Sequence, residues 1–200
     1  MRSRRFFLYL AFAAGLAGCS SGDSGTTPPS QTAGDLTSKG WKAYSAKSYT
    51  TALSDFSQAL ALDNSYSDAY NGEGWSYARL GNPDSALTAF TAGRSRDAAS
   101  ADMRAGAAFV YNALKSYTLS LEQDTALLRI SPSWKFSHDT AVNYLDLHLL
   151  AAENYFALEN FTASLAEVQF LNPSFGNPDV NTIAGQILLA REIERLGTFI

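Results

Sequence analysis

The residue types that most often carry catalysis are sparse in this chain. His138 and His148 are its only histidines, and their separation of ten residues fits no common zinc-binding pattern. No serine stands in a nucleophile elbow, and no glycine-rich loop could cradle a phosphate. Asp139 after His138 is typical of a helix start, where a carboxylate accepts from free amides, and Glu153 and Glu159 are expected on solvated helical faces. We therefore expect no enzyme, no metal and no cofactor.

Residues of matched type recur at an interval of 34 positions. The series includes Trp41, Trp75 and Phe109, and also the pairs Gly40 and Gly74, Ala52 and Ala86, and Phe56 and Phe90. A period of about 34 residues is typical of a helix–turn–helix array, in which each unit buries its apolar face only by stacking on a neighbour. At the same interval, one polar residue is expected to cap the second helix of each pair: Ser48, Asn82 and Ser116.

The repeat, numbered from 1 to 34 with the first unit at Ala33–Tyr66, resembles the tetratricopeptide repeat (TPR) family. That family has small residues at positions 8 and 20, an aromatic at 24 and a small residue at 27. The first two units match, with Gly40, Ala52, Phe56 and Ala59, then Gly74, Ala86, Phe90 and Gly93; the third keeps Ala108 but has Ser120, Asp124 and Leu127. The resemblance implies an all-α, right-handed solenoid of antiparallel helix pairs, with three to four TPR-like repeats and a C-terminal capping helix.

The same resemblance places one set of side chains on the concave face. In TPR proteins the first helices line this face, and position 9 is occupied here by three large aromatic residues. Rings offer contact area with few rotors, and amides can hydrogen bond a peptide backbone. We therefore expect an extended peptide or partner protein to bind at Trp41, Tyr44, Asn71, Trp75, Arg79, Phe109 and Asn112. The alternative is that the rings pack against neighbouring helices, or are covered by the N-terminal linker or the last helix.

Asp124 stands where the earlier repeats have phenylalanine. The position expected to face it across the helix pair is occupied by Leu36, Tyr70 and then Arg104. This change predicts a buried Arg104–Asp124 ion pair, in which loss of one partner would cost about 3 to 5 kcal/mol. The alternative is a local register shift that leaves Asp124 exposed.

The period breaks after Pro132. Residues 133–138 are expected to form a short irregular insert containing Trp134, followed by a helix over 139–158 and a second helix capped by Asn160. These would form a fourth, divergent repeat. A last helix is expected to start at Asn177-Pro178-Asp179 and to end near Gly197. As a cap with one wet face, it should bury Val180, Ile183, Ile187, Leu188 and Ala190 and expose Arg191, Glu192, Glu194 and Arg195.

The N-terminus has the pattern of a secretory signal, with three arginines before a short apolar run. Leu16-Ala17-Gly18-Cys19 resembles the bacterial lipobox, which implies a signal peptide over 1–18 and lipidation of Cys19 as the mature N-terminus. Ser20 and Ser21, with no aspartate there, favour the outer membrane by the sorting rule that this resemblance carries. The alternative is an ordinary signal peptide with a chance cysteine. Because Cys19 is the only cysteine, no disulfide can form within the chain.

Residues 19–34 are mostly Ser, Gly, Thr and Pro and are expected to be a flexible linker, which leaves 35–200 as one TPR-like domain. Removal of the three signal arginines would take the formal charge from −4 to −7; an acidic product without a basic cluster argues against nucleic acid. The sequence therefore predicts a lipid-tethered, non-enzymatic scaffold or adaptor of the bacterial envelope with other envelope proteins as partners. The alternatives are a permanent structural subunit of an envelope complex and a glycan-binding or cell-wall-fragment-binding protein.

Overall fold

The structure, a computed structural model, describes residues 31–198, and within that range the chain is all-α. The predicted Cys19 lipidation site and most of the predicted linker lie outside the described residues. In chain order the helices are α1 (Ala33–Ser45), α2 (Tyr49–Leu62), α3 (Ser67–Arg79), α4 (Pro83–Arg94), α5 (Ala101–Ala113), α6 (Tyr117–Ile130), α7 (Tyr144–Ala157), α8 (Phe161–Leu171) and α9 (Ile183–Leu196). No helix within 31–198 is long and apolar enough to cross a membrane.

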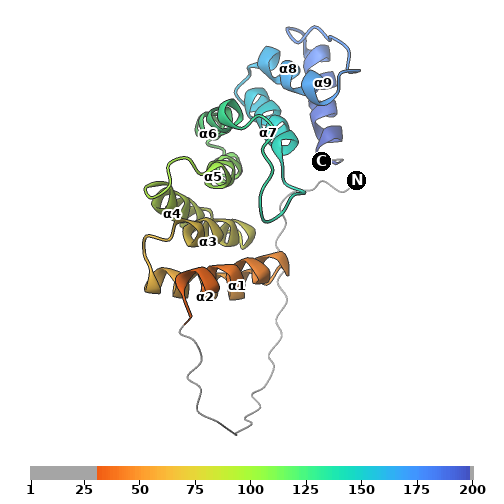
Figure 1. The fold of residues 1–200 in the computed structure, drawn as a ribbon. Helices are drawn as coiled ribbons and strands as arrows, with labels where there is room; N and C mark the ends of the chain where they lie inside the picture. The colour runs from red at the N-terminus through yellow and green to blue at the C-terminus, as the bar shows by residue number, and fades with distance from the viewer. Residues whose placement is uncertain (1–30, 199–200) are drawn as a thin grey trace, which may run out of the picture.

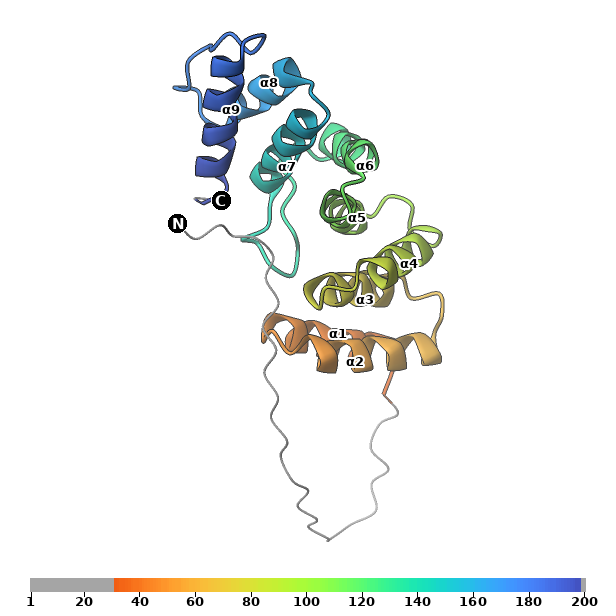
Figure 2. The same ribbon diagram turned by 180° about the vertical axis from the view of Figure 1, so that it is seen from behind.

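The helices form four consecutive pairs, α1–α2, α3–α4, α5–α6 and α7–α8, and α9 packs against the last pair. Figures 1 and 2 show the pairs stacked one upon another into a curved array. The prediction of an all-α solenoid of antiparallel helix pairs with a terminal helix is confirmed. Ala33 and Gly34, which the sequence analysis assigned to the linker, form the first turn of α1.

The turns inside the four pairs share one backbone conformation. Each contains a residue with positive φ just before the second helix: Lys47 at 59°, Gly81 at 74°, Lys115 at 60° and Glu159 at 59°. The predicted cap positions are correct, and the side chain of Asn82 accepts from the Ser85 amide. Ser48 and Ser116, however, make no side-chain cap bond. Their backbone angles resemble those of the asparagine cap Asn160, so the difference is the shorter reach of the serine hydroxyl.

A phenylalanine fills the wedge between successive repeats and requires glycine beside it. Phe56 is fully buried, and a Cβ built on Gly72 would lie 2.2 Å from its Cζ. Phe90 has the same relation to Gly106, at 2.3 Å. In the next repeat the position nine residues before the turn residue, where these glycines stand, is Leu150. A leucine there leaves no room for another aromatic ring, which accounts for a smaller residue, Asp124, in the third wedge.

Two predicted boundaries are wrong. The first helix of the fourth repeat begins at Tyr144 rather than 139, because Asn143 and Asp146 form a capping box. The last helix begins at Ile183, capped by Thr182, rather than near Asn177.

The face of α9 that is buried also differs from the prediction. The buried side is Gly185, Leu189, Glu192, Ile193 and Leu196, whereas Ile183, Ile187 and Leu188 are exposed. Gly185 sets this orientation, since a Cβ there would lie 2.0 Å from the Asp179 carbonyl oxygen and no larger residue could occupy that side. The buried Glu192 carboxylate accepts from Asn172 and Arg195.

Candidate functional site

The segment 131–143 between α6 and α7, called the insert below, runs back along the array toward α3 and α1 (Figures 1 and 2). It pairs with itself: the amide of Phe136 donates to Val142 O at 2.9 Å, and that of Tyr144 donates to Trp134 O at 2.8 Å. An isolated antiparallel bridge joins its two arms. The insert is therefore a small hairpin, longer and more ordered than the irregular loop that the sequence predicted.

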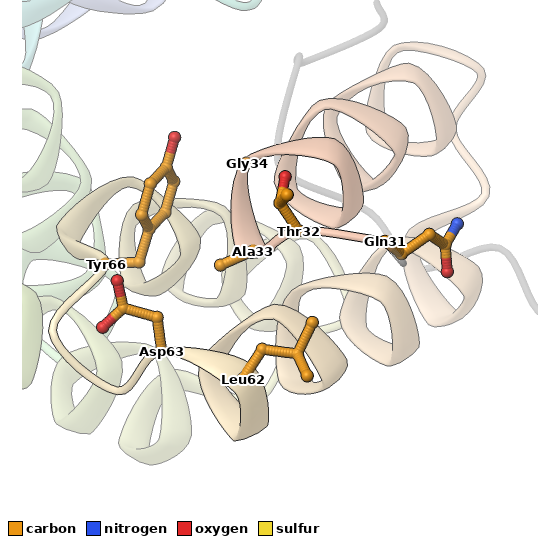
Figure 3. Close-up of a pocket in the computed structure, with 7 residues that line it drawn as sticks. All are labelled: Gln31, Thr32, Ala33, Gly34, Leu62, Asp63 and Tyr66. Atoms are coloured by element: carbon orange, nitrogen blue, oxygen red, sulfur yellow. The ribbon is translucent and has the colours of Figure 1, made fainter. Parts of the chain in front are cut away.

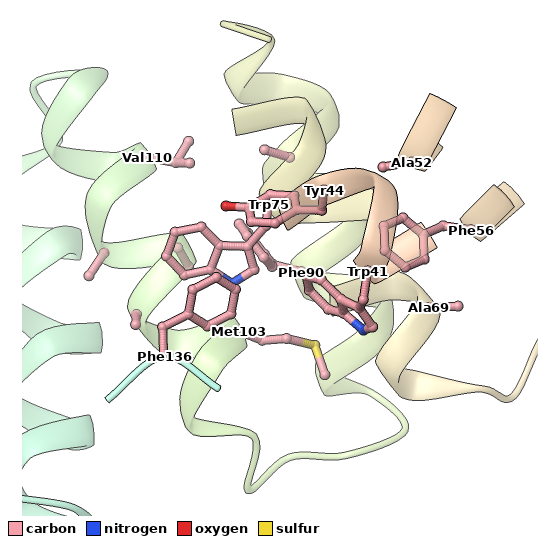
Figure 4. Close-up of a cluster of buried hydrophobic side chains, with 14 of the residues drawn as sticks. Trp41, Tyr44, Ala52, Phe56, Ala69, Trp75, Phe90, Met103, Val110 and Phe136 are labelled. Atoms are coloured by element: carbon pink, nitrogen blue, oxygen red, sulfur yellow. The ribbon is translucent and has the colours of Figure 1, made fainter. Parts of the chain in front are cut away.

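The insert places its rings on the aromatic row of the first helices. Phe136, fully buried, stacks on Trp75 with centroids 4.2 Å apart and planes 23° apart. The imidazole of His138 stacks on Trp41 at 3.5 Å with planes 5° apart. In the core cluster of Figure 4, Phe136 lies against Trp75, close to the rings of Trp41 and Tyr44. Rings from one hairpin thus complete a core that begins on α1 and α3.

Polar contacts hold the same segment in register. Asp102, in the first turn of α5, accepts from Trp134 Nε1 at 2.8 Å and from Ser137 Oγ at 2.6 Å. Asp68, its equivalent one repeat earlier, lies 3.9 Å from His138 Nε2. Asp139 of the insert accepts from Arg79 Nη2 at 3.3 Å. Each of three first helices therefore offers a ring or a charged group to the insert.

The predicted aromatic row exists, but it is not open. Trp41 is 6% exposed and Trp75 only 1%, while Phe109 is partly buried, 6.2 Å from Trp75. Both indole N–H groups are also used, by Asp68 Oδ2 at 2.9 Å and by the Asp102 carbonyl at 3.2 Å. The two indoles are buried in part because they pack against neighbouring helices, as the alternative held, with Trp41 on Phe56 and Trp75 on Phe90. The insert covers them as well, in place of the linker or the last helix considered above.

The other predicted site residues divide into two groups. Tyr44 and Arg79 lie beside the insert, with Arg79 Nε donating to the phenol oxygen at 3.0 Å; burial raises the pKa of Tyr44 to about 12, so this phenol stays neutral. Asn71 is buried and donates to Asp68 at 3.5 Å. Asn112 instead donates to Asn154 Oδ1 at 2.8 Å, in the link between the third and fourth repeats.

The insert's histidine has the chemistry of a stacked neutral ring. Burial lowers the pKa of His138 below its ordinary value, against the opposing effect of Asp68 and Asp102. The neutral imidazole is therefore the dominant form at neutral pH, which suits face-to-face contact with an indole. No group of three or more potential metal ligands occurs among residues 31–198.

Sequence reasoning missed Phe136 and the two acceptor aspartates. Two signals were present: Asp68 and Asp102 are 34 residues apart, and rings alternate along Trp134, Phe136 and His138. Alternation is typical of an extended segment with one side buried.

The predicted Arg104–Asp124 ion pair is wrong. Asp124 is buried, 1% exposed, so the alternative of an exposed register shift is wrong as well. Arg104 Nη2 instead donates to Ala98 O at 3.2 Å, and Oδ1 of Asp124 has no hydrogen-bond partner among the described residues. Burial, and secondarily the charge of Glu167, raises the pKa of Asp124 to about 8. Asp124 thus interacts electrostatically with Glu167 and Tyr155 of the fourth repeat, and it makes no ion pair with Arg104.

This buried carboxyl predicts a pH-dependent stability. The pKa of Asp124 is raised on folding from 3.8 to about 8, so its stabilising effect is complete below the unfolded value and is lost as pH rises toward 8. At about 1.4 kcal/mol for each pKa unit, the loss should amount to a few kcal/mol. The free energy of unfolding of Asp124→Asn, measured with urea, should depend less on pH over this range than that of the wild type. At pH 8.5 the variant should be the more stable of the two proteins. If the free energies of unfolding of both proteins changed equally with pH, the raised pKa would not belong to Asp124.

A shallow hollow also lies at the N-terminal edge of the array, where the start of α1 meets the end of α2 (Figure 3). Its carboxylate, Asp63, already accepts from Ser65 Oγ at 2.6 Å. Thr32 is likewise engaged, in the capping box of α1. The hollow therefore offers no cluster of reactive groups.

Neither a protein-family model nor a curated protein sequence matches this chain. Solved structures do share its fold. A thermophilic TPR protein from Thermus thermophilus aligns over 82% of this chain and 83% of its own, with a TM-score of 0.57 and 14% identity. A tetratricopeptide repeat protein from Parabacteroides merdae aligns over 86% of this chain and 63% of its own, with a TM-score of 0.57 and 17% identity. MamA aligns over 82% of both chains, with a TM-score of 0.59 and 15% identity. The fold is that of a TPR solenoid.

Proposed function

We propose that this chain is a non-enzymatic, membrane-tethered scaffold of the bacterial cell envelope that binds an extended peptide or partner protein on its concave face. One observation carries the proposal. The first helices hold one arm and the turn of the hairpin, residues 134–139, through stacked rings and carboxylate acceptors. A surface of aromatic rings and carboxylate acceptors is suited to binding a polypeptide. The TPR fold supports the same interpretation, since stacked repeats create extended concave binding surfaces.

The proposed tether is the lipidated Cys19, with Ser20 and Ser21 favouring the outer membrane. We expect Cys19→Ser to abolish labelling by a fatty-acid analogue and to release the protein from the membrane fraction. A Cys19→Ser chain that still sediments with membranes would contradict either the lipobox or the absence of a second anchor.

The scaffold function is tested by affinity capture from detergent-solubilised envelopes with the full-length chain as bait. Two arginine variants provide a matched comparison. Arg79→Ala alters the concave face beside the insert, whereas Arg94→Ala alters the end of α4, where the guanidinium donates to Gln123 at 2.7 Å. A partner retained by the wild type and by Arg94→Ala, but lost from Arg79→Ala, supports the proposal. A bait that retains nothing beyond a lipid-anchored control protein argues against it.

A permanent structural subunit is the second candidate, and the outer face of α9 favours it. Ile183 is 77% exposed, and Ile187 and Leu188 on the same helix are about half exposed. Clustered apolar side chains on a surface usually mark an interaction site. An obligate subunit should aggregate when produced alone without its signal, whereas an adaptor should remain a monomer in solution. The glycan alternative has no such support, because all three tryptophans are buried and offer no open face to a sugar.

A further inference from the structure

We infer that the concave face is a binding site for a peptide segment with ring side chains at alternate positions, and that the chain's own Trp134–Asp139 occupies this site as an intramolecular competitor. The inference rests on the proposed function and names the chemistry of the partner. Such a partner would present an N–H or hydroxyl donor toward Asp102, a flat ring toward Trp75, a second ring toward Trp41 and an acidic group toward Arg79.

The geometry assigns one ring of the segment to each repeat. Trp134 donates to α5, Phe136 stacks on Trp75 of α3, and His138 stacks on Trp41 of α1. The chain turns at Ser137 and His138, and Ser137 Oγ also donates to Asp102 of α5 at 2.6 Å. An unrelated segment that placed its rings in the same three positions would meet the same groups.

The insert can leave this face without breaking a backbone ladder. Its backbone hydrogen bonds lie within the segment 131–146 or at the end of α6, and none of them joins α1, α3 or α5. Side chains alone attach it to those helices. The groups that receive it belong to helices that also pack against their own second helices, α2, α4 and α6. The hairpin is thus held on the row by side-chain packing and side-chain hydrogen bonds.

An attached segment competes strongly. A short tether corresponds to an effective concentration in the millimolar range. Closure of the site raises the apparent Kd of any partner in inverse proportion to the fraction of molecules in which the site is open. Weakening the insert without damaging the array should therefore increase the affinity for a peptide added in trans.

The test uses a fluorescein-labelled peptide with the sequence of residues 131–143, and a control peptide with serine at the positions of Trp134 and Phe136. The full-length chain is purified in detergent as wild type and as Trp134→Phe/Ser137→Ala, which removes both donors to the half-buried Asp102 while keeping a ring. We expect the Kd from fluorescence anisotropy to be at least about ten-fold lower for this variant than for the wild type. The control peptide should bind neither protein.

Two further variants separate opening of the insert from general loosening. Trp134→Ala/Phe136→Ala removes both rings, and added peptide should raise its melting temperature. Leu165→Ala creates a cavity in the separate core beneath α8, and its affinity for the peptide should equal that of the wild type.

If Trp134→Phe/Ser137→Ala still melts cooperatively but binds no more tightly than the wild type, the insert is a fixed part of the core and the inference fails. This outcome does not depend on whether the double-alanine variant folds. A partner captured by the wild type would then still support the scaffold, whereas tight peptide binding without any captured partner would support the inference alone.

Discussion

Trp75→Ala should lower the free energy of unfolding by about 3 to 5 kcal/mol, the usual cost of truncating a buried tryptophan. Trp75 is 1% exposed. The centroid of its ring lies 4.2 Å from that of Phe136, 6.1 Å from that of Phe90 and 6.2 Å from that of Phe109. Alanine would leave a cavity bounded by the insert and by two repeats, and the Asp102 carbonyl would lose its donor. Denaturant unfolding followed by far-ultraviolet circular dichroism measures the loss.

Trp75→Phe is the matched control for this prediction. It keeps a ring in the stack but removes the indole N–H, so most of the stability should remain. An unchanged melting curve for Trp75→Ala would mean that the ring stands free in an open groove. The sequence placed Trp75 on the expected binding face, whereas its burial in the structure predicts that truncation lowers stability.

Gly72→Ala should destabilise the array by about 1 to 3 kcal/mol, as overpacked cores do. The new Cβ would lie 2.2 Å from Cζ and 2.3 Å from Cε1 of Phe56, and this ring is enclosed between two repeats. Because the clash is with one side chain, shortening that side chain should relieve it. The double variant Gly72→Ala/Phe56→Leu should lose less stability than the two single changes added together.

Gly176→Ala provides the control, since nothing lies within 4 Å of a Cβ at that position, and it should leave stability nearly unchanged. Strictly additive effects at Gly72 and Phe56 would show that the ring does not fill the wedge. The same pairing explains the third repeat, where Leu150 replaces the glycine and Asp124 replaces the phenylalanine.

The stacked helices were predictable because stacking makes the same demands on every repeat. Small residues such as Gly40 and Gly74, and the rings beside them, recur where the two helices of a pair meet, and recurrence is visible in a sequence. The turn positions followed for the same reason, since Asn82 and Asn160 hold equivalent places.

The remaining features depend on contacts that occur once. Nothing periodic indicates that Phe136 lies on Trp75, because the two residues are distant in sequence and belong to different repeats. The inward face of α9 is set by the approach of Gly185 to a carbonyl rather than by the count of apolar residues. Arg104 was predicted as the partner of Asp124 from the equivalent positions of the earlier repeats. That prediction is wrong because Asp124 occupies the wedge between the third and fourth repeats.

The insert also changes how the array should come apart. In a linear repeat protein each unit touches only its neighbours, and the ends can fray independently. Here Asp139 meets Arg79 across 60 positions of the chain, and His138 reaches the first repeat. Repeats one to three are therefore cross-linked by a non-covalent strap and should open as a single cooperative unit. The end formed by α8 and α9, with its own core, lacks this strap and is free to unfold first.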